Sequence, residues 1–157
     1  MKQAELARQH AILKGLIKRA GHDPTTKQLE MLAHWGKYLC VLTAGFVENV
    51  VRLTYSAYVV KAGSKQTARY AQAEIAQIQN PKARRLVDIA KAFDPQWGSD
   101  LEVFLDDNFR GEAVDAIMSN RHQSAHGKNS GITLAQVDQY LTRIVEIAEF
   151  IETQCGI

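Results

Sequence analysis

Three side chains that could bind an anion and move a proton lie close together: Arg121, His122 and His126. An arginine guanidinium presents a forked set of hydrogen-bond donors that fits phosphate and carboxylate oxygens. A histidine, with a reference pKa of about 6.5, can donate or accept a proton near neutral pH. The segment therefore has the residue types for general acid–base chemistry beside a bound anion.

The segment ends a stretch that is apolar at helical spacing, and one stripe of the predicted helix comprises Val114, Ile117, Met118, Arg121 and Ala125. Arg121 takes a place that a hydrophobic residue would fill, so we expect either a buried acid beside it or a cleft that holds an anion. Arg121 and His126 diverge by about 140° around the helix and are about 7.5 Å apart along it. One straight helix cannot bring both to a small ligand, although Gly127 favours a loosened last turn.

Two other interpretations of these residues remain open. His122 and His126 are four residues apart, which suits zinc, but Gln123 replaces the glutamate of the zincin pattern and no third ligand is evident. A metal-dependent hydrolase that uses His122 and His126 therefore stays an alternative. In the interpretation that we favour, the protein uses no metal and no cofactor. Arg121 and His126 could instead form a structural network with Glu48, although Glu48 is better placed to pair with Arg52 one helical turn away.

The elements that must position this segment all read as helices, and the 157 residues suit a single domain over 1–157. We predict an all-α, up-and-down bundle of about six to seven helices. The predicted helices cover residues 4–19, 24–61, 64–79, 81–93, 99–107, 111–125 and 134–155. Pro81 is expected to open its helix, Ser99 to cap the next, and Thr133 with Gln136 to form a capping box before the last.

The second predicted helix is unusually long. At 1.5 Å per residue, residues 24–61 would extend about 57 Å, more than the roughly 40 Å across a compact domain of this size. The helix is therefore expected either to bend, near Gly36 or residues 43–45, or to project along a dimer.

Two segments resemble a known family. The run Asn120-Arg121-His122-Gln123-Ser124-Ala125-His126-Gly127 resembles the signature of HEPN domains of the RiboL-PSP type, and residues 44–49 resemble an earlier helix of that type. The similarity extends over about residues 30–153. It implies a dimeric helical bundle that is, in many members, a metal-independent RNA endonuclease and often the toxin of a toxin–antitoxin or defence locus.

The resemblance also implies roles for particular residues. Arg121 and His126 match the catalytic pair, His122 matches a variable polar position, and Glu48 and Asn49 match supporting positions. Such chemistry needs a ribose 2′-hydroxyl to attack phosphorus, a histidine to transfer protons, commonly worth about 10² to 10⁴ in rate, and a cation to stabilise the developing charge. Those roles suit His126 and Arg121.

Charge and composition indicate the partners. We predict that RNA binds to basic side chains, namely Lys82, Arg84, Arg85 and Lys128. The other expected partners are a second copy of the chain and an antitoxin protein, with no DNA and no membrane. Two distant cysteines and the short apolar run over 38–47 favour a reducing, cytoplasmic location. As an alternative, a non-catalytic dimeric module would bind RNA, nucleotide or a protein, with the acidic stretch over 94–115 as its surface.

Overall fold

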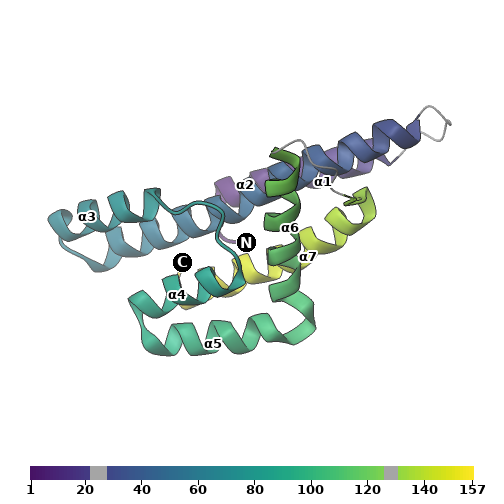
Figure 1. The fold of residues 1–157 in the computed structure, drawn as a ribbon. Coiled ribbons are helices and arrows are strands. Elements are labelled where there is room, and N and C mark those ends of the chain that lie inside the picture. The colour runs from purple at the N-terminus through teal and green to yellow at the C-terminus, as the bar shows by residue number, and fades with distance from the viewer. Residues whose placement is uncertain (22–27, 126–130) are drawn as a thin grey trace.

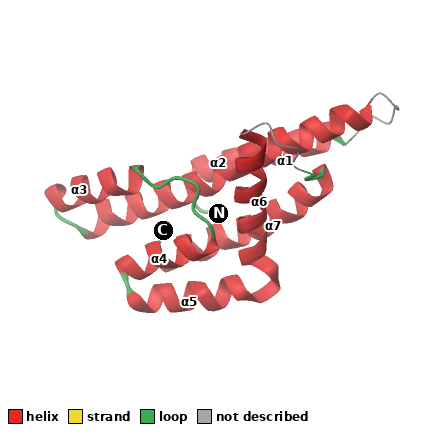
Figure 2. Cartoon of the chain, viewed as in Figure 1, coloured by secondary structure: helices red, strands yellow, loops and turns green. Residues whose placement is uncertain are grey.

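The computed structural model describes the backbone of residues 1–21, 28–125 and 131–157, and these ranges contain helices and no strand. The prediction of an all-α fold is confirmed (Figures 1 and 2). The helices are α1 (Ala4–Ala20), α2 (Gln28–Ala62), α3 (Lys65–Ala76), α4 (Ala83–Phe93), α5 (Pro95–Asp106), the short 3-10 turn η1 (Asp107–Phe109), α6 (Arg110–Ala125) and α7 (Leu134–Gln154). None of these described helices is long and apolar enough to cross a membrane.

Helix α2 is the element on which the others are built. It is one continuous helix of 35 residues, and at 1.5 Å per residue it is about 52 Å long. Helix α1 packs along it, α3 packs on its C-terminal part, and α6 crosses it in front of α7 in Figure 1. The bend expected at Gly36 or residues 43–45 does not interrupt the helix, so a single rigid element reaches from one end of the molecule to the other.

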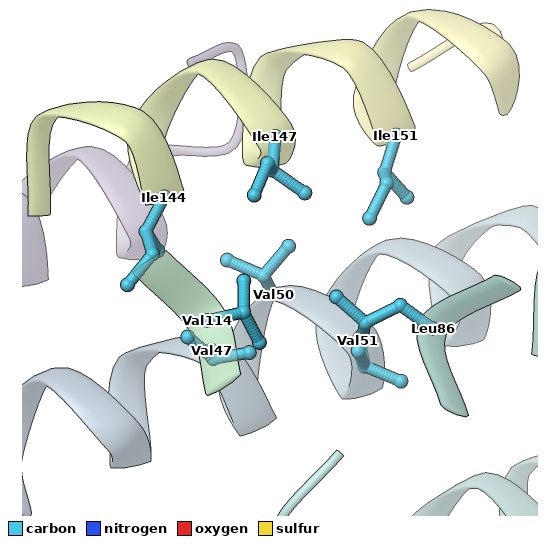
Figure 3. A pocket seen from close by; sticks show the side chains of 8 residues that line it. All are labelled: Val47, Val50, Val51, Leu86, Val114, Ile144, Ile147 and Ile151. Atoms are coloured by element: carbon cyan, nitrogen blue, oxygen red, sulfur yellow. The ribbon is translucent and has the colours of Figure 1, made fainter. Parts of the chain in front are cut away.

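The core lies where α2, α6 and α7 meet. Val114 and Ile117 of α6 are fully buried, and Met118 is almost so. The apolar stripe of the motif helix is therefore filled by its own chain, and a dimer is not needed to cover it. Around Val114, eight aliphatic side chains enclose a void of about 10 Å³ with no polar lining (Figure 3): Val47, Val50, Val51, Leu86, Val114, Ile144, Ile147 and Ile151. A void this small and apolar stays dry.

Two predicted helix starts were wrong, and capping explains both. Helix α4 begins at Ala83 rather than at Pro81. The Ala83 amide donates to the Asp115 carboxylate of α6 at 2.8 Å, which satisfies the first amide of the helix. Helix α5 begins at Pro95 because Asp94 Oδ1 accepts from the Gln96 amide at 2.7 Å. The predicted cap Ser99 instead lies inside α5, and its hydroxyl donates to the Pro95 carbonyl at 3.2 Å.

The two ends of the described chain are joined by a buried carboxylate. Glu152, near the end of α7, is 1% exposed and accepts from the Lys2 amide at 2.7 Å and the Gln3 amide at 3.0 Å. Gln3 itself provides no side-chain cap for α1. Glu152 therefore satisfies amides at the start of α1 from the opposite end of the sequence. At the start of α7, the capping box of Thr133 and Gln136 is confirmed.

Candidate active site

Arg121 lies in the last turn of α6, where the buried stripe of that helix reaches the surface. Its side chain is half-buried, one turn beyond the fully buried Ile117. Among the described residues, no carboxylate lies within 4.0 Å of the guanidinium to form an ion pair. A partly desolvated cation without a neutralising acid in the described chain is suited to hold an anion.

Cys40 of α2 fixes the end of α6 beneath Arg121. Its thiol is fully buried and donates to the Ile117 carbonyl at 3.4 Å. Burial raises the pKa of Cys40 to about 12, although a hydrogen bond from the backbone of Arg121 and the charge of Arg121 both favour the thiolate. The thiol therefore stays protonated at neutral pH. We interpret it as a packing and hydrogen-bonding contact between α2 and α6, because only a thiolate would be a nucleophile.

One turn earlier in α2, Gly36 lets the chain that leads into α7 approach closely. A Cβ atom built on Gly36 would lie 2.6 Å from the Ile132 carbonyl oxygen and 3.4 Å from the Leu134 amide nitrogen. Only glycine permits this separation of the two backbones. The sequence after the motif thus rejoins the fold against the same helix that holds α6 through Cys40. Helix α2 therefore fixes the position of the motif from both sides.

The structure places the other predicted motif residues as follows. His122 is exposed and lies next to Arg121 on α6. His126 and Lys128 lie outside the described residues, so their predicted roles stay predictions. Asn120, one residue before Arg121, donates its side-chain amide to the Ala116 carbonyl at 2.8 Å and so bonds within its own helix.

Glu48 and Asn49 of α2 contact other parts of the chain. Glu48 Oε1 accepts from the amide of Asn80, whose φ of +48° places it in the left-handed region, at 2.8 Å. The expected pair between Glu48 and Arg52 is not formed, because Arg52 donates to the Ile78 carbonyl at 3.0 Å. Both side chains therefore support the turn between α3 and α4. Asn49 donates to Gln9 Oε1 of α1 at 3.0 Å.

The basic residues predicted to bind RNA lie at the start of α4 and differ in their surroundings. Lys82, Arg84 and Arg85 are all exposed. Arg84 pairs with Glu102 at 3.0 Å and with Asp88 at 3.4 Å, so much of its charge is neutralised. Arg85 forms no ion pair or hydrogen bond with the described residues and faces a groove between α3 and α4. Of the two arginines, Arg85 has the guanidinium that is available to a ligand.

Two positions that shape the site, Gly36 and Cys40, were not singled out by the sequence as functional. Gly36 interrupts an otherwise helical pattern at a cost in helix stability, and such a glycine suggests a packing reason. Cys40 gave no such signal, because a single cysteine in an apolar run resembles any other core residue.

In the described residues, Arg121 and His122 lie in the last turn of α6, which packs on the long helix α2. The sequence matches the RiboL-PSP-HEPN family model over residues 5–156, nearly the whole chain, so the chain belongs to the RiboL-PSP-HEPN family of the HEPN superfamily. A comparison with curated proteins found no match, and neither did a comparison with solved structures.

Proposed function

We propose that this chain, acting as one HEPN domain over residues 1–157, is a metal-independent endoribonuclease. The observation that carries the proposal is Arg121 itself: a half-buried cation at the end of α6, without a carboxylate partner in the described residues, in a chain of the RiboL-PSP-HEPN family. A toxin-like or defence role, with an antitoxin protein as a partner, belongs to the same proposal and rests on the family alone.

The reaction follows from the chemistry of the groups. The ribose 2′-hydroxyl loses its proton and attacks the adjacent phosphorus, and the bond from phosphorus to the 5′-oxygen breaks. The leaving oxygen gains a proton, so the products carry a 2′,3′-cyclic phosphate and a 5′-hydroxyl. His126 transfers protons, and the Arg121 guanidinium stabilises the charge on the five-coordinate phosphorus. DNA lacks the attacking hydroxyl and is not a substrate for this reaction.

We propose further that the active form is a homodimer with two sites that straddle the two-fold axis. Each site takes Arg121 from one subunit and His126 from its partner, because these residues diverge around their own helix. An exposed apolar surface supports the proposal. Ile12 of α1 is 45% exposed, and Tyr38 and Val41, which flank Cys40 in α2, are 51% and 39% exposed. A groove of about 250 Å³ between α1 and α2 continues this surface from Ile12 and Val41 to Asn49.

Cleavage by the purified protein tests the catalytic proposal. We expect His126→Ala to lower the cleavage rate of a single-stranded RNA by at least about 10², the usual contribution of a general acid or base, with an almost unchanged melting temperature. Arg121→Ala should lower the cleavage rate to a similar extent. A His126→Ala protein that remains fully active, or that is unfolded, would show that this histidine is structural.

Mixing the two inactive variants tests the shared site. If one site takes Arg121 from one subunit and His126 from its partner, each heterodimer of Arg121→Ala with His126→Ala regains one intact site. Random exchange gives about half heterodimers, so roughly a quarter of the wild-type activity should return. A monomer at the assay concentration that still cleaves RNA would refute the dimeric site.

A further inference from the structure

A groove between α3 and α4 is not used by the proposed reaction. Helix α3 packs on α2 and α4 packs on α5, and between α3 and α4 lies an open groove of about 420 Å³. Its floor is apolar and includes Ile75, Ile89 and Phe93. Ligand sites in proteins commonly measure about 300–1,000 Å³ and combine apolar walls with a few polar groups, so the groove is large enough for one nucleotide.

Tyr70 of α3 forms one wall of this groove and is unusually exposed for an aromatic residue. Its side chain is 72% exposed, and within the described residues it forms no hydrogen bond and no ring contact. By contrast, Tyr55 and Tyr58 both contact the ring of Phe93. An exposed ring beside an apolar floor is a surface on which a nucleobase can stack, a contact worth about 1–3 kcal/mol per base.

Arg85 of α4 supplies a cation to the same groove. Unlike the neighbouring Arg84, it forms no ion pair with the described residues. Glu74 and Asp88 also line the groove, but Asp88 is paired with Arg84 at 3.4 Å. Over residues 64–93 there are six Lys or Arg and two Asp or Glu, a net charge of +4, whereas the whole chain carries +2. This concentration of positive charge favours a polyanion over an acidic or apolar small molecule.

We propose that the groove between α3 and α4 holds one unpaired nucleotide of a single-stranded RNA, with its base on the ring of Tyr70 and its phosphate against Arg85. This rests on the proposed ribonuclease function, which makes RNA the polyanion. Helix α4 starts against α6, where Asp115 accepts from the Ala83 amide, and Arg121 lies six residues further along α6, about 9 Å. A strand that occupies the groove can therefore continue towards the motif.

Binding of a labelled single-stranded RNA to the His126→Ala protein, measured by fluorescence anisotropy, tests the proposal without cleavage of the probe. Tyr70→Ala should weaken binding about fivefold or more, the equivalent of one stacked base, and Tyr70→Phe should bind as the parent does. Arg85→Gln should weaken binding and reduce the slope of log affinity against log salt by about 0.7, the value for one phosphate contact on a single strand.

Arg84→Gln is the matched control. It removes the same charge from the adjacent position, but from a side chain that pairs with Glu102 and Asp88 and does not line the groove, so RNA affinity should fall less than in Arg85→Gln. If Arg84→Gln and Arg85→Gln weaken binding equally, the effect is one of overall charge, and the groove proposal is overturned. Unchanged affinity in both Tyr70→Ala and Arg85→Gln would also overturn it and would leave the groove to a protein partner.

Failure of the groove and failure of the ribonuclease proposal are distinguishable. If wild-type protein cleaves RNA and the groove variants bind RNA normally, the groove proposal fails and the ribonuclease proposal stands. If wild-type protein binds RNA through Tyr70 and Arg85 but cleaves nothing, the groove proposal stands and the ribonuclease proposal fails. A wild-type protein that neither binds nor cleaves RNA removes both.

Discussion

Replacing Gly36 by alanine should disturb the motif from a position that is 85 residues away from Arg121 in the sequence. The added Cβ would lie 2.6 Å from the Ile132 carbonyl oxygen, whereas real contacts of this kind lie at 3.0–3.4 Å or beyond. The backbone that enters α7 must therefore move away from α2 by about 0.4–0.8 Å. Misplacement of about 1 Å can cost a reaction up to about 10²-fold, so we expect roughly a tenfold loss of RNA cleavage.

The effect on stability has two opposing parts. Alanine in the interior of a helix gains about 0.5–1 kcal/mol over glycine, while forced overpacking costs about 1–3 kcal/mol. Gly45→Ala in the same helix is the control, since nothing lies within 4 Å of a Cβ built on Gly45. This variant should gain the stability of alanine over glycine in a helix without any cost of overpacking. Urea unfolding should therefore place Gly36→Ala about 1–3 kcal/mol below Gly45→Ala. Equal stability of the two variants, with full cleavage by Gly36→Ala, would refute this account of the contact.

Three further predictions concern the fold. Glu152→Ala should cost about 1–3 kcal/mol by leaving two amides of the first turn unsatisfied, whereas Glu149→Ala, at an exposed position, should change thermal stability by less than about 0.5 kcal/mol. Val50→Ile adds a methyl group beside the apolar void and should raise the free energy of unfolding by up to about 0.8 kcal/mol, measured in urea. A lower free energy of unfolding would mean that the void is too small for the methyl group. Burial raises the pKa of the Cys40 and Cys155 thiols from 9.0 to about 12, so their contribution to stability is complete below pH 9 and is lost between pH 9 and 12. Between these pH values the free energy of unfolding should fall by about 1.4 kcal/mol per pH unit for each thiol. If a Cys40→Ala, Cys155→Ala double variant keeps the full slope, the two thiols are not its cause.

Local patterns in the sequence predicted what depends on local physics. The burial of Val114, Ile117 and Met118 on α6 and the capping box before α7 both involve residues within two helical turns, and both were confirmed. The start of α5 was predicted wrongly, although Asp94 followed by Pro95 is a capping pattern that can be recognised in the sequence. In the structure, the first turn of α5 is also held by Trp97, which packs edge-on against Tyr58 at 5.0 Å, a contact between segments far apart in sequence.

Parts of the site that depend on tertiary contacts could not be predicted. Helical spacing made Arg52 the natural partner of Glu48, but the folded chain offers the amide of Asn80, which needs a partner at its left-handed turn. In the same way, the role of Gly36 depends on a carbonyl almost 100 residues later. The position of Arg121 on a helix, one turn beyond the buried Ile117, could be predicted because that inference needed only periodicity.

The central claim is that RNA is cut by an arginine and a histidine without a metal, and one gel tests it most directly. Single-stranded RNA is incubated with purified wild-type or His126→Ala protein in excess chelator, and the new ends are identified. We predict cleavage by the wild type only, with 2′,3′-cyclic phosphate ends, and no cleavage of a substrate that is 2′-deoxy throughout. Loss of cleavage in chelator that returns with zinc or manganese would contradict it and favour a metal-dependent hydrolase.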